Sequence, residues 1–286
     1  MQILAMNAGE PDYDLLYNPR LTVPDWQQAF QRWDRGSEQA RASLAAYLDV
    51  PYGPGEAEKL DVFRSQGPSR ALLVFIHGGY WRSLDKKSFS FLAPALTRAG
   101  VTLAVPNYSL CPAVRVRDIV MQMVQACAWA YRNGSNFGAP AGRLYVCGHS
   151  AGGHLTAMML ATLWPAYAAD LPAKTVLAGY SISGLYDLED IRKTPSINAD
   201  VRLDPASARE ASPALMPPAT DAPLCTAVGE KENEGFHTQD RIIAERWKKV
   251  HKAGLVSPGD DHFTVLERLA DPASALHRDV LGMMGL

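Results

Sequence analysis

A serine flanked by glycines follows a short apolar run near the middle of the chain. Leu144–Cys147 is apolar and β-rich, residues 148–152 read GHSAG and match G-x-S-x-G, and an apolar helical run begins at Leu155. Strand, tight turn and helix are the context in which this pattern exposes a serine hydroxyl above a sheet. A chance serine in a glycine-rich turn is the alternative. The predicted chemistry is attack by Ser150 on a carbonyl carbon.

A second glycine pattern, HGGYW at residues 77–81, directly follows an apolar run. A carbonyl attacked by Ser150 becomes a tetrahedral oxyanion, which requires backbone N–H donors already directed at it. Two consecutive glycines allow the backbone to turn its amides into the cavity. We expect the donors to be the N–H groups of Gly78 or Gly79 and of Ala151, with an ordinary Gly-Gly turn as the alternative.

The general base is expected to be a histidine on the C-terminal side of the serine. His149 and His154 are too close to Ser150, and His77 belongs to the glycine loop. The candidates that remain are His237, His251, His262 and His277. His251 lies among lysines on what we expect to be a solvated helix face, and His277 lies beside an arginine in a C-terminal helix. His262 is favoured because its Gly-Asp-Asp-His loop follows the last core elements, from where a side chain can reach over the sheet. A purely structural His262 is the alternative.

An acid must hold the tautomer of the histidine and stabilise the imidazolium. We expect it after the penultimate strand, Leu224–Gly229, and favour Glu232, three residues beyond the glycine. Glu230 and Glu234 are the local competitors, and Asp187, after the preceding strand, is the distant one. Glutamate can fill the role, although its extra methylene requires a slightly retracted loop.

Positioning these residues requires alternating strands and helices. The predicted strands are 59–63, 71–76, 101–106, 144–147, 175–182 and 224–229. The predicted helices are 25–48, 86–99, 114–132, 155–161, 238–253, 263–270 and 273–284, and residues 1–23 are expected to be irregular. Such alternation implies an α/β fold with a mostly parallel sheet covered by helices on both faces.

A proline-rich segment, 184–218, differs from the rest of the chain. Prolines separate short helical pieces there, which is typical of an inserted cap over a site rather than of a separate domain. We therefore expect residues 1–286 to form a single α/β domain, with an N-terminal helical segment at 24–48 and a small cap insertion at 184–218.

The composition of the chain favours a globular α/β protein and gives no sign of a nucleic-acid-binding or membrane-spanning one. The chain has 286 residues, 47% hydrophobic and 20% charged, which suits one large α/β domain or two small ones. Its net charge of −2 gives no reason to expect a nucleic acid or an anionic membrane as partner. The first residues have no basic n-region, and no stretch approaches the roughly 18 apolar residues of a membrane span.

The four cysteines form no CxxC pair, which favours reduced packing residues in a cytoplasmic protein. We expect a small-molecule substrate as the partner. The sequence leaves a homo-oligomer open.

Several motifs together resemble one family. HGGYW, GHSAGGHL, SGLYDL, a VG-x-x-E turn, EGFHTQ and DDHF resemble the arylformamidase (kynurenine formamidase) branch of the α/β-hydrolase superfamily, from roughly residue 46 to the C-terminus. The resemblance places Ser150, Glu232 and His262 on the family's catalytic positions. It places Gly78, Gly79 and Ala151 on the oxyanion-hole positions. Animal members have Asp where this chain has Glu232. The family needs no metal or organic cofactor, and nothing in the sequence has metal-ligand spacing.

The resemblance implies a serine hydrolase that cleaves a small aryl formamide, such as N-formylkynurenine, to the amine and formate through a formyl-enzyme. Candidate ring-binding residues are Tyr80, Trp81, Phe236 and His237, of which the first two could equally be packing residues. A carboxylesterase for short acyl esters would use the same residues and is the alternative. A non-catalytic binding protein on this fold is a third, although such proteins usually lack the nucleophile or the base.

Overall fold

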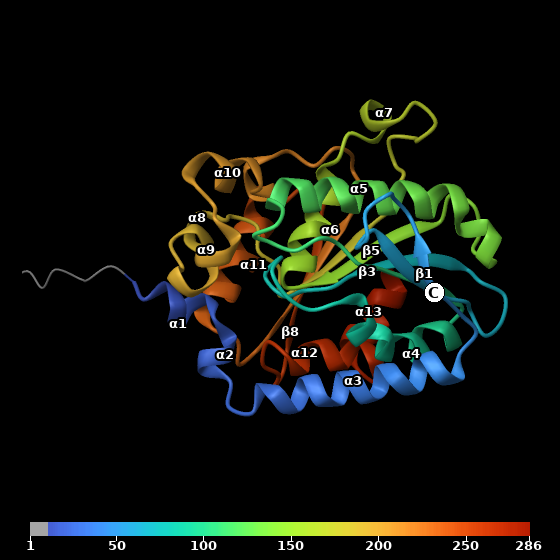
Figure 1. The fold of residues 1–286 in the computed structure, drawn as a ribbon, viewed down its shortest axis with the longest axis horizontal. Helices are drawn as coiled ribbons and strands as arrows, with labels where there is room; N and C mark the ends of the chain where they lie inside the picture. The colour runs from blue at the N-terminus through green and yellow to red at the C-terminus, as the bar shows by residue number, and fades with distance from the viewer. Residues whose placement is uncertain (1–10) are drawn as a thin grey trace, which may run out of the picture.

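An eight-stranded sheet organises the computed structural model, which describes residues 11–286 apart from the side chain of Ala253 (Figure 1). Its strand order is β1-β2-β4-β3-β5-β6-β7-β8. The pairs β1/β2 and β2/β4 are antiparallel, and the pairs from β4/β3 to β7/β8 are parallel. The strands are β1 (Ala46–Pro51), β2 (Lys59–Phe63), β3 (Ala71–Ile76), β4 (Val101–Pro106), β5 (Leu144–His149), β6 (Gly179–Ile182), β7 (Leu224–Gly229) and β8 (His251–Ser257). The predicted mostly parallel α/β architecture is confirmed.

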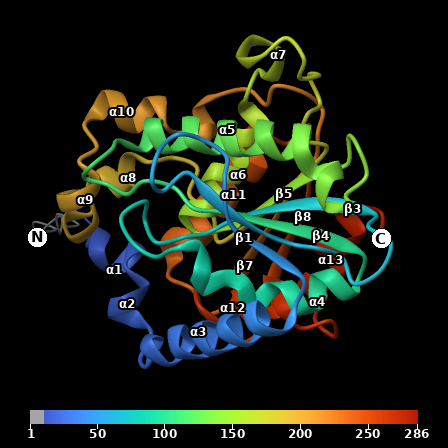
Figure 2. The same cartoon turned by 45° about the vertical axis from the view of Figure 1, so that its right-hand side comes forward.

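Helices cover both faces of the sheet, as Figures 1 and 2 show. One face carries α5 (Val116–Asn133), α6 (Ala151–Ala161) and α11 (Glu234–Arg246). The other carries α3 (Trp26–Ser43), α4 (Ala93–Arg98), α12 (Thr264–Glu267) and α13 (Ala275–Met283). The remaining short elements are α1 (Tyr13–Tyr17), α2 (Pro19–Thr22), α7 (Trp164–Tyr167), α8 (Glu189–Arg192), α9 (Pro195–Val201), α10 (Pro205–Glu210) and the 3₁₀ helices η1 (Lys86–Leu92), η2 (Gly134–Phe137), η3 (Pro213–Leu215) and η4 (Arg268–Ala270). No helix within the described residues is long and apolar enough to cross a membrane.

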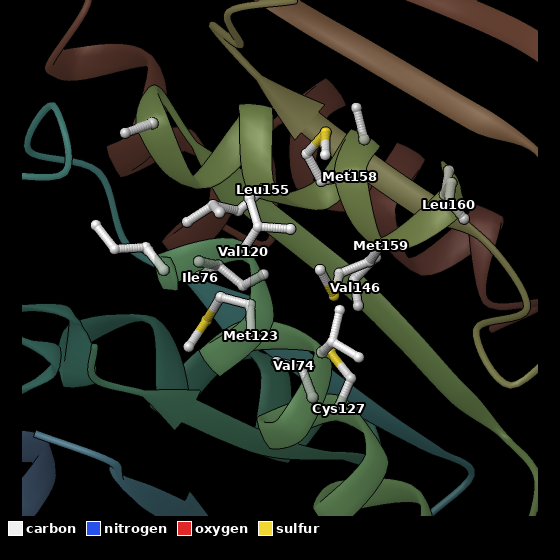
Figure 3. Packing of buried hydrophobic residues seen from close by; sticks show 14 of the residues in the cluster. Val74, Ile76, Val120, Met123, Cys127, Val146, Leu155, Met158, Met159 and Leu160 are labelled. Atoms are coloured by element: carbon white, nitrogen blue, oxygen red, sulfur yellow. The ribbon is translucent and has the colours of Figure 1, made fainter. Parts of the chain in front are cut away.

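The central strands are buried along their whole length because both of their faces are covered. Every residue of β3, β4 and β5 is buried. Val74 and Ile76 of β3 pack on the α5/α6 side, where Figure 3 shows them against Val120 and Met123 of α5. Leu73 and Phe75 point to the α3 side. This double burial explains why continuous apolar runs predicted these strands correctly.

Both boundaries of the helix predicted over 238–253 are wrong. Helix α11 begins at Glu234 and ends at Arg246, and His251–Ser257 forms the edge strand β8. His251 lies on this strand with its Nε2 2.9 Å from Oγ1 of Thr226, rather than on a solvated helix face. Pairing with β7 supplies the backbone hydrogen bonds of this segment, and that tertiary contact overrides its local pattern.

Other boundaries also differ from the prediction. The first long helix stops at Ser43, and the chain then forms β1 against β2. The helix predicted over 86–99 is a 3₁₀ helix followed by α4, whose start carries Pro94. Within the residues expected to be irregular, α1 and α2 form, while residues 1–10 and the absence of a signal peptide predicted there lie outside the described residues.

Segment 184–218 folds into the short elements α8, α9, α10 and η3, three of which begin at a proline. Figure 2 shows α8–α10 gathered at one end of the sheet, beside α1 and α2. The Tyr17 hydroxyl donates to Asp190 at 3.0 Å, and the Asn18 amide donates to the Ser196 hydroxyl at 3.0 Å. These contacts join the N-terminal helices to the inserted segment.

Candidate active site

Ser150 occupies a strained turn between β5 and α6. Its backbone angles are φ 58° and ψ −118°, a conformation that residues other than glycine rarely adopt. A Cβ on Gly152 would lie 1.9 Å from the carbonyl oxygen of Ile76, and one on Gly148 would lie 2.1 Å from the carbonyl oxygen of Gly152. The two glycines are therefore required by close backbone approach, as a nucleophile elbow requires.

Glu232 and His262 form a buried pair. His262 Nδ1 lies 2.6 Å from Oε2 of Glu232, and the side chains of His262 and Glu232 are 3% and 0% exposed. With Nδ1 donating to the carboxylate, Nε2 of a neutral His262 is left as a proton acceptor. This is the arrangement in which a histidine serves as a general base.

The other carboxylate oxygen of Glu232 accepts two hydrogen bonds. Oε1 accepts hydrogen bonds from the Ser183 hydroxyl at 2.5 Å and from the Gly229 backbone N–H at 2.7 Å. Sequence reasoning missed Ser183, which follows β6 and so reaches the end of the neighbouring strand β7. Its position at the carboxyl end of a parallel strand was the available signal.

The three competing acids lie elsewhere. Asp187 Oδ1 accepts from the Glu189 backbone N–H at 3.0 Å, at the start of α8. Glu230 accepts from the backbone N–H of residue 259 at 2.7 Å, and Glu234 pairs with Arg241 at the surface. Of the four candidates, only Glu232 contacts His262.

Ser150 and His262 line one pocket. The empty space between its walls, including the open mouth, is about 490 Å³. The walls come from α2, α3 and the segments around both glycine motifs and His262. The lining residues are Asn18, Pro19, Arg20, Phe30, Trp33, Gly79, Tyr80, Arg82, Ser83, Leu84, His149, Ser150, His262 and Phe263.

The expected oxyanion loop lies against the elbow. A Cβ on Gly78 would be 3.1 Å from Cβ of Ser150, and Gly79 has a φ of 109° that glycine adopts readily. The Gly79 carbonyl accepts from the Arg82 and Ser83 backbone N–H groups, each at 3.1 Å. Ala151 opens α6 directly after Ser150. Gly78 and Ala151 therefore lie directly beside Ser150, and Gly79 lines the same pocket.

Two further histidines brace the site. Nε2 of His149 donates to the backbone carbonyl of His262 at 2.8 Å, and burial, with the neighbouring His262 as a further cause, lowers the pKa of His149 well below its usual value. His77 stacks on Tyr108 with centroids 4.2 Å apart, and burial lowers its pKa as well. Both rings therefore stay neutral and act as positioning groups.

Of the four residues predicted to bind the ring, only Tyr80 lines the pocket. Tyr80 lies on the pocket wall, where its hydroxyl donates to the Tyr17 carbonyl. Trp81 is fully buried, donates to Nδ1 of His154 at 3.2 Å and is not among the residues that line the pocket. Phe236 is buried with its ring centroid 4.3 Å from that of His262, behind the pocket, and His237 does not line it.

Aromatic residues from other segments take the place of those three. Phe30 and Trp33 of α3, together with Phe263, line the pocket. Their signal was the aromatic spacing of Trp26, Phe30 and Trp33 on one helix face, which is equally typical of core packing. Segment 184–218, expected to cover the site, contributes no residue to this pocket and instead contacts the N-terminal helices that form its wall.

The sheet order, the elbow at Ser150 and the Glu232–His262 pair at the strand ends define an α/β-hydrolase. A family model described as the alpha/beta hydrolase fold matches residues 73–252. Within the described residues, no group of three or more His, Cys, Asp or Glu side chains could hold a metal ion.

Sequence similarity to known proteins identifies the branch of this superfamily to which the chain belongs. A kynurenine formamidase of Danio rerio is 33% identical over 94% of this chain and 92% of its own length. The esterase LipC of Mycobacterium tuberculosis is 30% identical over 74% of this chain and 58% of its own. A solved structure titled a putative thioesterase, from Silicibacter sp. TM1040, is 33% identical with a TM-score of 0.82, covering 93% of this chain and 98% of that one. The chain belongs to the arylformamidase (kynurenine formamidase) branch of the α/β-hydrolases and is a hydrolase.

Proposed function

We propose that this hydrolase cleaves a small aryl formamide, such as N-formylkynurenine, by a serine mechanism. The observation that carries the proposal is the Glu232–His262 pair, 2.6 Å apart, whose histidine lines one pocket with Ser150 at the tip of its elbow. The resemblance to kynurenine formamidases over nearly the whole chain supports the formamide as substrate.

In the first half-reaction, the Ser150 hydroxyl oxygen attacks the formyl carbon while Nε2 of His262 takes its proton. The carbonyl oxygen gains negative charge, and the N–H groups of Ala151 and of Gly78 or Gly79 stabilise it. The C–N bond then breaks, and His262 returns the proton to the leaving aryl amine. Glu232 stabilises the imidazolium throughout, because its carboxylate already accepts from Nδ1.

In the second half-reaction, a water molecule loses a proton to His262 and attacks the formyl ester of Ser150. The same donors stabilise the second tetrahedral intermediate. Its collapse releases formate and restores the Ser150 hydroxyl with the proton from His262. The flat aromatic walls of Phe30, Trp33 and Phe263 suit an aryl leaving group.

A short-chain carboxylesterase is the second candidate. The similarity to LipC favours it, and ester cleavage would use the same residues in the same roles. The discriminating experiment compares kcat/KM of the purified protein on N-formylkynurenine and on p-nitrophenyl acetate. We expect the formamide to be the better substrate. Efficient ester cleavage with no detectable formamide cleavage would overturn the formamidase proposal and leave the esterase.

A further inference from the structure

The pocket has a positively charged wall. Its permanently charged lining side chains are Arg20 and Arg82, and no aspartate or glutamate is among the described residues that line it. The other walls are mostly aromatic and aliphatic. An electropositive side in a largely apolar pocket favours a ligand that carries both a ring and an anionic group.

Arg82 is hydrogen-bonded to α9 through one guanidinium nitrogen, which leaves its other N–H groups able to bind a ligand. Its Nη1 donates to the Ser196 carbonyl at 2.8 Å and to Asp200 at 2.5 Å, both on α9. Its Nε and Nη2 have no hydrogen-bond partner among the described residues. The side chain is 21% exposed, so these nitrogens are held in place by the other contacts while they remain able to donate.

Arg20 approaches from α2 without a carboxylate partner. Its guanidinium carbon lies 4.8 Å from the centroid of the Trp26 ring and 5.6 Å from that of Phe30. No carboxylate of a described residue lies within ion-pair distance of it. Partial burial against these rings, with the charge of Arg82 as a further cause, lowers the pKa of Arg20, which nevertheless remains protonated. Repulsion between the two guanidiniums would be relieved by an anion between them.

We propose that Arg20 and Arg82 form a carboxylate-binding subsite, which selects substrates whose aromatic leaving group carries a carboxylate. This inference rests on the proposed function, because it assigns the part of the pocket that receives the leaving group. Arginine binds carboxylates through paired N–H donors, and stacking on the aromatic rings holds the planar group of Arg20 in position. The contacts of Arg82 with α9 give segment 184–218 a role in positioning this subsite.

The test uses two matched substrate pairs. The first is N-formylkynurenine and its derivative with the carboxylate converted to a carboxamide. The second is meta-acetoxybenzoate and meta-acetoxybenzamide, which are esters. The readout is the ratio of kcat/KM for the member with the carboxylate over the member with the carboxamide. The ester pair measures the subsite even where no formamide is cleaved, so failure of the formamidase proposal is distinguishable from failure of the subsite.

Arg20→Gln and Arg82→Gln are each expected to lower this ratio about tenfold or more, mainly through KM, as expected for loss of a charged hydrogen bond. Arg32→Gln is the matched control, because Arg32 lies on α3 outside this pocket and pairs with Glu267. Asp200→Asn removes the negative charge beside Arg82 but leaves an amide oxygen to which Nη1 can donate, so it separates loss of the ion pair from loss of the Arg82 guanidinium. We expect it to retain most of the discrimination.

Melting temperatures of all four variants show whether each one folds. A ratio within about twofold of wild type in both Arg20→Gln and Arg82→Gln, with both proteins folded, would overturn the subsite. An equal fall of the ratio in Asp200→Asn and Arg82→Gln would also contradict it, because the effect would then come from the position of α9. Arg82→Gln removes the ion pair with α9, whereas Arg20→Gln breaks no ion pair with a described residue. Arg20→Gln therefore carries the decision if the Arg82→Gln protein does not fold.

Discussion

Replacing Glu232 by glutamine is expected to change the tautomer of His262, so that its proton lies on Nε2 instead of Nδ1. The Gly229 backbone N–H can only donate, so the amide oxygen of the introduced glutamine must take the place of Oε1, 2.7 Å from it. The amide NH₂ then faces Nδ1 of His262 in the place of Oε2. Because two donors cannot face each other, His262 must carry its proton on Nε2, where it can no longer accept the proton of Ser150.

The size of the effect follows from these contacts. Turning the amide around would restore the tautomer of His262 but set the NH₂ against the Gly229 N–H, which costs about 1–3 kcal/mol in a buried site. The inactive tautomer also lacks the carboxylate charge that stabilises the imidazolium. Together these losses predict a fall in kcat of about 10³- to 10⁴-fold. KM and thermal stability should change little, since the substitution conserves shape.

The assay is steady-state hydrolysis of p-nitrophenyl acetate and N-formylkynurenine, with a thermal melt as the folding control. Asp187→Asn is the matched control, because Asp187 contacts the start of α8 and not His262. It should act on stability rather than on kcat. The reasoning would be refuted by a Glu232→Gln variant that keeps more than about a tenth of wild-type kcat, or by a larger loss in Asp187→Asn.

Two further predictions concern the site, and a third concerns the buried His154 outside the pocket. Ser183→Ala removes the hydroxyl donor to Glu232 and should lower kcat about tenfold, while Ser135→Ala, a surface control on η2, should not. Because the proposed acyl group is a formyl group, kcat/KM with p-nitrophenyl esters should fall from acetate to octanoate, by about 1–3 kcal/mol for each methylene that the pocket cannot accommodate, and a peak at octanoate would contradict the formamidase proposal. Burial lowers the pKa of His154 from 6.5 to about 4, so stability should fall by about 3 kcal/mol as the pH drops from 6.5 to 4. Urea unfolding of wild type and His154→Gln checks this, and equal pH slopes in the two proteins would contradict it.

The core strands and the elbow could be predicted because their signals are local. Residues 71–76 are apolar throughout since both faces of β3 are buried. Gly148 and Gly152 had to be glycine for reasons of backbone contact that involve only the elbow and the adjacent strand β3. The contact of Gly152 with Ile76 joins residues distant in sequence, but the G-x-S-x-G pattern places both glycines beside the serine, so the elbow could be recognised without knowledge of that contact.

The edge strand and the pocket walls could not be predicted in the same way. Strand β8 depends on pairing with β7, and its sequence alone resembles the end of the preceding helix. Phe30 and Trp33 line the pocket because α3, on one face of the sheet, packs their rings against Phe263. Ser183 contacts Glu232 through the adjacency of β6 and β7. Each of these facts is a tertiary contact, and the residue types involved are also common in ordinary packing.

The proposal that Ser150 attacks the formyl carbon is tested most directly by formate release from N-formylkynurenine, measured for wild type and Ser150→Ala side by side. Circular dichroism and a thermal melt of both proteins control for folding. We expect wild type to release formate and the variant to be slower by about 10⁴- to 10⁶-fold, because the loss of a nucleophile that acts in concert with its base removes the covalent route. A folded Ser150→Ala protein that releases formate at more than about a tenth of the wild-type rate would contradict the serine mechanism.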